Sequence, residues 1–217
     1  MHNVHKNNYN EKHENSHVFL KKKKGKSRMK KWIYIVLIPI IMIAGFCGYL
    51  YYQETFPVEN LVYGDLEAPI EIVNYTSFQC PPCARFHATY GEVLEKYIDN
   101  GAVQLVLKAV DLDKFEYDEI IYKHLTNDQL TDYVELSKIY AKQDEWYSLD
   151  SKEEVISFLG LNEDKSRDLD RQIKQNSKER VKLGIKGVPT TFINGKEMEL
   201  GITAEEFETQ ILSLLEE

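Results

Sequence analysis

The sequence predicts an α/β domain preceded by one apolar helix. A stretch of 21 residues without a charged side chain, residues 32–52, comes before the domain. From residue 61 onward the pattern is strand, helix, strand, helical block, hairpin and helix, with the inserted helical block at about residues 114–183. A Cys-Pro-Pro-Cys motif stands where the first strong strand gives way to a helix. These features divide the chain into a tail (1–31), an anchor (32–52), a linker (53–60) and one domain (61–217).

The apolar stretch from Trp32 to Tyr52 is long enough to span a bilayer as a helix. Eight Lys and Arg residues lie between positions 21 and 31, and such clusters stay on the cytoplasmic side of a membrane. We therefore expect a single-pass cell-membrane protein with a cytoplasmic N-terminus and an extracytoplasmic domain. Residues 1–31 are polar and rich in Asn, Lys and His, which predicts a disordered basic tail.

Two other interpretations compete for the same apolar stretch. A cleaved signal peptide would need a small-x-small site at its end, and none is present, so an uncleaved signal-anchor is favoured. A lipoprotein would be acylated at Cys47, but the bulky Phe46 directly before it fits that poorly. We expect Cys47 to fill apolar space within the membrane, since it lies far in sequence from the other two cysteines.

The charge of the chain is divided unevenly. Of 27 basic and 35 acidic residues, residues 1–52 hold 10 and 2, so the remainder carries a net charge of −16. An acidic exterior domain argues against binding to nucleic acid or to an anionic membrane surface. Its length is typical of a single domain with one core.

The Cys-Pro-Pro-Cys motif joins a predicted buried strand, residues 70–75, to an amphipathic helix. Cys80 would lie at the N-terminus of that helix, where unpaired N–H groups and the helix dipole stabilise a thiolate. Cys83 follows one turn later and can close a disulfide with it. Pro81 suits the first turn, because its missing N–H would have no partner there. The apolar face of the helix is expected to comprise Phe86, Tyr90, Val93, Leu94, Tyr97 and Ile98.

The rest of the domain is predicted from weaker signals. A second buried strand over residues 103–110 suggests a parallel crossover with the first. Asn127-Asp128 opens a helix, and capping boxes are expected at Ser151 and Thr203. An Asn-Gly turn at residues 194–195 predicts a hairpin of strands Thr190 to Ile193 and Glu197 to Leu200. Buried positions of the long helices are expected to include Leu130, Val134, Ser137, Ala141, Leu169, Ile173 and Val181.

The number of cysteines limits what the pair can do. Only Cys80 and Cys83 lie outside the apolar stretch, and a loop closed between adjacent turns restrains little chain, so a scaffolding role is disfavoured. A structural zinc site normally has four ligands, and no second cysteine pair exists. His87, four residues after Cys83, could complete a three-ligand set for a metal carrier, but a lone helical His is more often a packing or surface residue.

With these motifs in place, residues 58–217 resemble the thioredoxin superfamily, and specifically the DsbA-like thiol–disulfide oxidoreductases, including the membrane-anchored forms of Gram-positive bacteria. The resemblance rests on Phe78-Gln79-Cys80-Pro81-Pro82-Cys83, on the inserted helical block, and on Gly187-Val188-Pro189-Thr190 before an Asn-Gly hairpin. It implies a thioredoxin fold with an inserted helical block, preceded by the one transmembrane helix.

The resemblance also implies roles for individual residues. Cys80 would be the exposed nucleophile, Cys83 the buried resolving cysteine, and Pro189 a cis-proline facing the pair. A substrate peptide would pair with Val188, with Thr190, Pro81 and Pro82 beside it. The redox group would be the Cys80–Cys83 disulfide, with no organic cofactor and no metal. The expected partners are exported cysteine-containing proteins and a quinone-linked membrane thiol oxidase that recycles the pair.

Three positions depart from the family pattern. Many relatives place a buried acid six residues before the nucleophile and a carboxylate three before it, and these positions are Asn74 and Ser77 here. Acid–base help for Cys83 would therefore come from water or another group. Pro82 removes a backbone N–H that could stabilise the Cys80 thiolate. We therefore expect a milder oxidant than the strongest family members, whose nucleophile has a very low pKa.

Three alternatives to a disulfide-forming enzyme stay open. A reductase of the same fold would receive electrons across the membrane, and Pro82 leans toward that behaviour. A tethered binding module or chaperone would use an apolar groove around Phe78 and Val188, and its function would survive loss of both cysteines. A metal carrier would use Cys80, Cys83 and His87.

Overall fold

The computed structural model describes residues 24–55 and 60–216, which fall into two units. In the first, α1 (Lys24–Thr55) is one long helix containing Pro39, and its apolar side chains between Tyr34 and Tyr49 are largely exposed. Residues 1–23 of the predicted disordered tail lie outside the described residues, whereas residues 24–31 form the first turns of α1. None of the helices formed by the described residues combines the length and the hydropathy needed to cross a bilayer. The anchor over residues 32–52 therefore stays a prediction.

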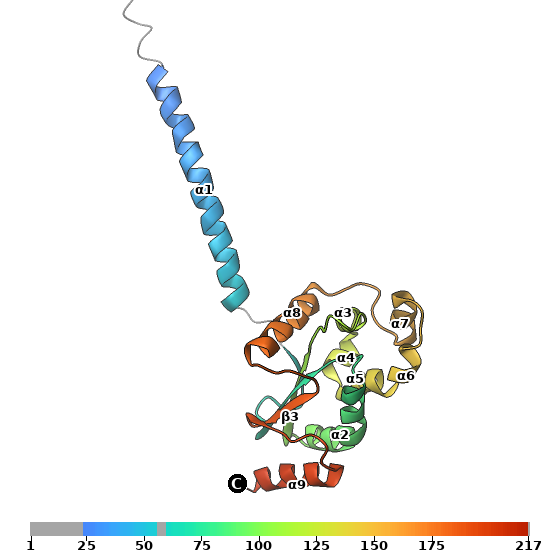
Figure 1. Cartoon of the computed structure of the whole chain (residues 1–217). Coiled ribbons are helices and arrows are strands. Elements are labelled where there is room, and N and C mark those ends of the chain that lie inside the picture. The colour runs from blue at the N-terminus through green and yellow to red at the C-terminus, as the bar shows by residue number, and fades with distance from the viewer. Residues whose placement is uncertain (1–23, 56–59, 217) are drawn as a thin grey trace, which may run out of the picture. The chain divides into compact units, whose positions relative to one another are not determined.

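The second unit, Pro57–Glu217, contains a five-stranded sheet in the order β1-β3-β2-β4-β5 (Figure 1). Its two central strands, β2 (Ile70–Thr76) and β3 (Val103–Ala109), run parallel, as the crossover predicted. The antiparallel strand β1 (Leu61–Tyr63) pairs with β3 and was not expected, since three residues give no readable alternation. On the other side of β2 lie β4 (Thr190–Ile193) and β5 (Lys196–Glu197), both antiparallel to their neighbours.

The helix α2 (Pro81–Asp99) follows β2 directly, and its predicted apolar face is confirmed. Phe86, Tyr90, Leu94 and Tyr97 are buried, and the other two predicted residues of that face are partly buried. The last helix, α9 (Ala204–Leu215), packs against α2, as Figure 1 shows. The capping box that starts α9 at Thr203 is complete, because both of its reciprocal hydrogen bonds are present.

The inserted block contains six helices in the described structure, and the break between two of them corrects the predicted pattern. One helix was expected from Asn127, with Leu130, Val134, Ser137 and Ala141 facing inward. Instead the backbone of Asp132 is extended and separates two helices, so the buried face of the second shifts to Tyr133, Leu136, Ile139 and Tyr140. The six helices are α3 (Asp118–Lys123), α4 (Asn127–Thr131), α5 (Tyr133–Ala141), α6 (Gln143–Trp146), α7 (Lys152–Phe158) and α8 (Arg167–Lys182).

The buried face predicted for the last helix of the block is corrected. Val181 is 67% exposed, and the amphipathic face of α8 instead buries Gln172 and Asn176 beside Leu169 and Ile173. The side-chain amide of Asn176 donates to the Ala109 carbonyl at 3.1 Å, which compensates the burial of a polar group.

The hairpin turn is as predicted, with positive φ at Asn194 and Gly195, but its second strand ends at Glu197 rather than Leu200. Of the capping box expected at Ser151, half forms. The Ser151 hydroxyl accepts from the Glu154 N–H, whereas the Glu154 carboxylate accepts from the Asp150 N–H instead of the Ser151 N–H.

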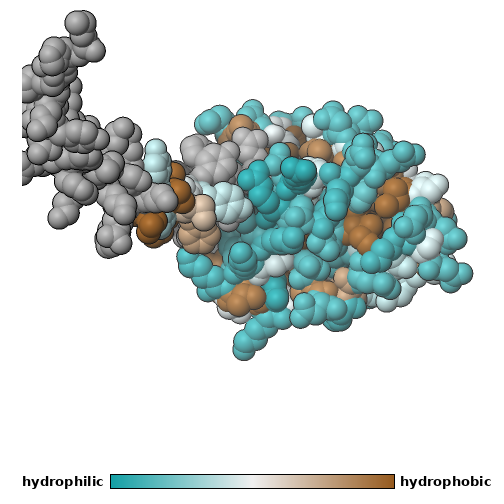
Figure 2. All heavy atoms as spheres, turned by 90° about the horizontal axis from the view of Figure 1, so that it is seen from above, coloured by the Kyte–Doolittle hydropathy of each residue, from teal (hydrophilic) through white to brown (hydrophobic). Residues whose placement is uncertain are grey.

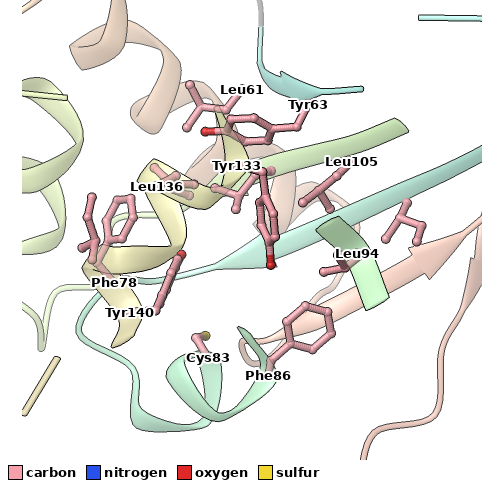
Figure 3. Packing of buried hydrophobic residues seen from close by; sticks show 14 of the residues in the cluster. Leu61, Tyr63, Phe78, Cys83, Phe86, Leu94, Leu105, Tyr133, Leu136 and Tyr140 are labelled. Carbon is pink, nitrogen blue, oxygen red and sulfur yellow. The ribbon is translucent and has the colours of Figure 1, made fainter. Parts of the chain in front are cut away.

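The core of the domain lies between the sheet, α2 and the inserted block. Figure 3 shows Cys83 projecting from the first turn of α2 toward this core, with Phe78 and Tyr140 close by. The face of the domain seen in Figure 2 is mostly hydrophilic with separate apolar patches, in keeping with its acidic composition. In the first turn of α2, Cys83 thus belongs to the packed interior, whereas Pro81 and Pro82 are exposed.

Candidate active site

The two cysteines of the motif occupy the start of α2. Cys80 is the N-cap residue with an extended backbone, and Pro81 and Pro82 follow at the first helical positions. The Cys80 carbonyl accepts hydrogen bonds from the N–H groups of Cys83 (2.9 Å) and Ala84 (3.1 Å), so the helix begins at the motif itself. Both sulfurs are free thiols here, and Cys83 is fully buried, as expected. Cys80 was expected to be exposed but is only 5% exposed, because the cis-proline loop lies against its sulfur.

The loop before β4 lies against the first of these cysteines. The Val188–Pro189 peptide bond is cis, and the Cys80 thiol donates to the Val188 carbonyl at 3.4 Å. Thr190 begins β4 and its hydroxyl donates to the Gly187 carbonyl, which closes the turn that carries the proline. Residues about a hundred positions apart in sequence therefore meet at one sulfur.

The two thiols have opposite tendencies to ionise. The pKa of Cys80 is lowered to about 6, chiefly because the Cys83 thiol donates to its sulfur; desolvation opposes this, and the Cys83 backbone, Lys114 and Arg85 reinforce it. Burial, together with the neighbouring Cys80, raises the pKa of Cys83 far above its ordinary value, although the Thr76 hydroxyl and the Ser77 backbone lower it in part. Cys80 can thus be a thiolate near neutral pH while Cys83 keeps its proton.

The Cys80 sulfur borders a cleft of about 410 Å³ that separates the loop after β3 from the cis-proline loop. Basic side chains stand out in this cleft within an otherwise acidic domain, although two aspartates also line it. Its other lining residues include Leu112, Lys114, Arg180, Lys186 and Val188. A second hollow of about 340 Å³ lies between α2 and α5, bordered by Pro81, His87 and Tyr140.

A buried carboxyl group that the sequence analysis missed holds the loop before Cys80. Asp118, at the start of α3, accepts from the Ser77 hydroxyl at 2.6 Å and from the Gln79 N–H at 2.9 Å. The Gln79 side chain in turn accepts from the Tyr117 N–H at 2.6 Å. Asp118 belongs to a run of surface-like acids in the sequence, so no local signal marks it; only the tertiary packing brings it to the motif.

The positions where relatives have acids are neutral here but remain polar. Asn74 is fully buried on β2, and its side-chain amide donates to the Thr191 hydroxyl at 2.8 Å. Thr76, on the same strand, shares a hydrogen bond with the Tyr140 hydroxyl at 2.9 Å. The sequence analysis left open which group gives acid–base help to Cys83. The structure places the hydroxyls of Thr76 and Tyr140 there rather than a carboxylate.

His87 is occupied by packing contacts. Its ring stacks on Tyr140 with centroids 3.9 Å apart, and its Nδ1 shares a hydrogen bond with the Tyr133 hydroxyl at 3.0 Å. Burial lowers the pKa of His87 to about 3, so the ring is neutral. Within residues 24–55 and 60–216 no three His, Cys, Asp or Glu side chains form a group able to hold a metal ion. The metal-carrier alternative gains no supporting contact from this geometry.

The family model described as thioredoxin matches residues 57–212. The chain belongs to the thioredoxin family. A Bacillus anthracis protein of this kind, named disulfide bond formation protein D, is 28% identical over 152 residues, covering 61% of this chain and 68% of the relative. A Rickettsia bellii relative, named a protein-disulfide oxidoreductase, is 27% identical over 112 residues, or 50% of this chain and 43% of its own length.

Solved structures of several other proteins have the same fold. An Enterococcus faecalis protein of unknown function is 26% identical with a TM-score of 0.61, covering 71% of this chain and 90% of its own. Wolbachia pipientis alpha-DsbA1 is 21% identical with a TM-score of 0.58, covering 75% of this chain and 94% of its own. Bacillus subtilis BdbD is 18% identical with a TM-score of 0.55, covering 73% of this chain and 94% of its own. These structures show the fold of the chain, and the named relatives identify it as a protein-disulfide oxidoreductase.

Proposed function

We propose that this thioredoxin-family protein is a membrane-anchored, extracytoplasmic oxidoreductase that introduces disulfides into exported proteins through Cys80 and Cys83. The observation that carries the proposal is the position of the Cys80 sulfur. It lies at a helix N-terminus with a lowered pKa and faces the Val188 carbonyl next to a cis-proline. An ionised, peptide-facing sulfur is what thiol–disulfide exchange requires.

The reaction starts from the Cys80–Cys83 disulfide. A substrate thiolate attacks the Cys80 sulfur, the S–S bond breaks, and Cys83 leaves with the electron pair and takes up a proton. Its raised pKa favours that protonation, and the Thr76 hydroxyl and the Ser77 backbone stabilise the transient charge. A second substrate thiolate then attacks the substrate sulfur of the mixed disulfide and releases Cys80 as a thiolate. The substrate loses two electrons and two protons, and the enzyme is left as the dithiol.

Substrate binding is proposed to use the cis-proline loop. An extended peptide would pair with the backbone of Val188, so that its cysteine meets Cys80. Pro189 and Thr190 would shape that edge, while Pro81 and Pro82, both exposed, would contact the peptide from the helix side. No organic cofactor or metal takes part, because the disulfide itself carries the electrons.

The cellular setting is proposed from the sequence. Residues 32–52 would anchor the protein in the cell membrane with its N-terminus in the cytoplasm, consistent with the apolar, exposed side chains between Tyr34 and Tyr49. A quinone-linked membrane thiol oxidase would return the dithiol to the disulfide. Exported cysteine-containing proteins would be the substrates.

The test uses three single variants of the full-length chain and a reduced test protein. Cys80→Ser should abolish disulfide formation, because the attacked sulfur is gone. Cys83→Ser should lose turnover, because the pair can no longer form a disulfide. Offered the same test protein with its disulfides intact, its Cys80 thiolate should attack one of them and accumulate as a mixed disulfide, seen on non-reducing gels, because no Cys83 is present to resolve it. Cys47→Ser is the matched control and should keep full activity. Undiminished activity of Cys80→Ser would reject the proposal.

A reductase is the second candidate, favoured by one observation. A pKa of about 6 for Cys80 exceeds the value of about 3.5 typical of a strong oxidant of this family. We expect a milder pair, in line with Pro82, and equilibration with glutathione measures it. A potential as high as about −120 mV would contradict this expectation. Trapping the pair in intact cells separates the two directions, since an oxidase is found mainly as disulfide and a reductase as dithiol.

A further inference from the structure

The inference concerns the buried carboxyl group of α3 and the loop that it holds. Asp118 is 1% exposed, although most acids of the domain face solvent. Its two oxygens accept from the Ser77 hydroxyl and from the Gln79 N–H, which belongs to the residue directly before Cys80. A third contact between the same segments runs from the Tyr117 N–H to the Gln79 side chain. The inserted block thus reaches the redox motif through one acid and its neighbour.

The loop so held contacts both cysteines. Residues 77–79 end at Cys80, and the Cys80 N–H donates to the Ser77 carbonyl at 3.3 Å. The Ser77 backbone also interacts with the sulfur of Cys83 and lowers its pKa. The hydroxyl of that same serine is bonded to Asp118. The carboxyl group of Asp118 is therefore hydrogen-bonded to the residue before Cys80 and to a serine whose backbone interacts with both cysteines.

Within the part of the chain that the structure describes, Asp118 is buried and has no cation beside it, so its negative charge can act on neighbouring ionisable groups. No salt bridge is formed by this carboxyl among the described residues, and its partners are a hydroxyl and backbone N–H groups. Interactions between charges are screened much less in a buried site than at the surface. A negative charge here raises the free energy of a Cys80 thiolate nearby but leaves the neutral disulfide almost unaffected.

We propose that Asp118 is a positioning residue that moderates the oxidising strength of the Cys80–Cys83 pair: its carboxylate holds the loop before Cys80 and, by its charge, disfavours the thiolate of the reduced protein. This inference rests on the proposed thiol–disulfide exchange at the same pair. It assigns to the inserted block a carboxyl group that β2 lacks, because Asn74 and Ser77 are neutral. A pair whose reduced form is less stable is a weaker oxidant.

Other ionisable groups around Asp118 influence its pKa. Asp111, after β3, raises its pKa, and Tyr140 of α5 faces it from the core. From α8, Asp170 pairs with Lys123 in the last turn of α3 and with Lys174. The charged residues of α7, from Lys152 to Glu154, are exposed. Burial is the largest cause of the raised pKa of Asp118, about 7, so the charge forms near neutral pH.

The decisive variant is Asp118→Asn, which keeps an oxygen for the Gln79 N–H and can still bond Ser77, but loses the charge. We expect the glutathione equilibrium to move about 3- to 10-fold toward the dithiol protein. The midpoint of the pH dependence of Cys80 alkylation should fall by about half a unit to one unit, since tenfold corresponds to one pKa unit. A role limited to holding the loop predicts no such shift, because Asn preserves the hydrogen bonds.

The matched control is Asp132→Asn, which removes one negative charge from the exposed N-cap of α5 and retains its capping oxygen. In Asp132→Asn, the glutathione equilibrium constant and the ionisation constant of Cys80 should stay within about twofold of the wild-type values, because an exposed charge is screened. An unchanged equilibrium and midpoint in Asp118→Asn, or a shift toward the disulfide, overturns the proposal. A wild-type protein that does not equilibrate with glutathione at all would instead overturn the proposed function.

A second measurement uses the wild-type chain, so it still tests the proposal if Asp118→Asn fails to fold. With carbon-13 in the aspartate carboxyl groups, the raised midpoint of Asp118 can be followed by NMR in the disulfide and dithiol forms, with Asp111→Asn identifying the other raised signal. Because coupling is reciprocal, the Asp118 midpoint should be higher in the dithiol form, where a thiolate lies nearby. Equal midpoints in the two forms overturn the proposal.

Discussion

Cys80 shows how several weak effects set the behaviour of one atom. The Cys83 thiol, the Cys83 backbone and two cations lower its pKa, and desolvation opposes them. The helix N-terminus contributes less than in an ideal case, because Pro81 and Pro82 present no N–H. The pKa of about 6 is thus the balance of a neighbouring thiol against burial, and small changes in local charge should move it.

Removing the Lys114 charge should raise the pKa of Cys80. Lys114→Gln takes away an attractive interaction with the thiolate, and the side chain is exposed, so we expect a rise of less than about one unit that shrinks in high salt. The measurement is the pH dependence of Cys80 alkylation at two ionic strengths.

The matched control for this effect is Lys186→Gln. Lys186 lines the same cleft, whereas the two cations that lower the pKa of Cys80 are Lys114 and Arg85. Its variant should retain the wild-type midpoint. If both variants raise the midpoint equally, the effect belongs to the overall charge of the cleft rather than to Lys114.

At the scale of elements, the inserted block supports the site through the break at Asp132. The Asp132 carboxylate caps α5 by accepting from the N–H groups of Val134 (2.8 Å) and Glu135 (3.4 Å). Starting α5 at Tyr133 turns Tyr133 and Tyr140 inward, where they contact His87 and Thr76. The cap therefore sets which face of α5 meets the cysteine-bearing helix.

Asp132→Ala should lower the free energy of unfolding by about 1 kcal/mol, as is typical for loss of an N-cap. Urea denaturation followed by circular dichroism measures it. Thr131→Ala, at the preceding exposed position, is the control and should cost less, because its hydroxyl only donates to the Asn127 carbonyl within the same helix. An equal loss in both variants would contradict a capping role for Asp132.

How far the elements could be predicted depends on the range of the interactions that define them. The strand, motif and helix from Ile70 to Ile98 carry local signals, and they fold as expected. The break at Asp132 and the short strand β1 depend on partners distant in sequence, so periodicity alone missed them. Asp118 was missed for the same reason: its neighbours in sequence resemble surface acids, and its partners lie about forty residues earlier.

At the scale of the whole molecule, two buried groups couple stability to pH in opposite directions. His87 has a pKa lowered from 6.5 to about 3, so its contribution to stability is present above pH 6.5 and is lost as the pH falls toward 3. Asp118 has a pKa raised from 3.8 to about 7, so its contribution is present below pH 3.8 and is lost as the pH rises toward 7. Between about pH 4 and 6.5 the two slopes largely cancel.

In Asp118→Asn, the pH dependence of the free energy of unfolding should show the slope that His87 contributes. In the window from about pH 4 to 6.5 the folded wild type binds one more proton at Asp118 than the unfolded chain does. Removing that group should make the free energy of unfolding increase with pH by about 1.4 kcal/mol per unit more steeply than in the wild type. Urea titrations at several pH values measure the slope, and Asp132→Asn should leave it near the wild-type value. A slope in Asp118→Asn equal to that of the wild type would mean that Asp118 is already ionised throughout this window, and that its burial is balanced by its hydrogen bonds.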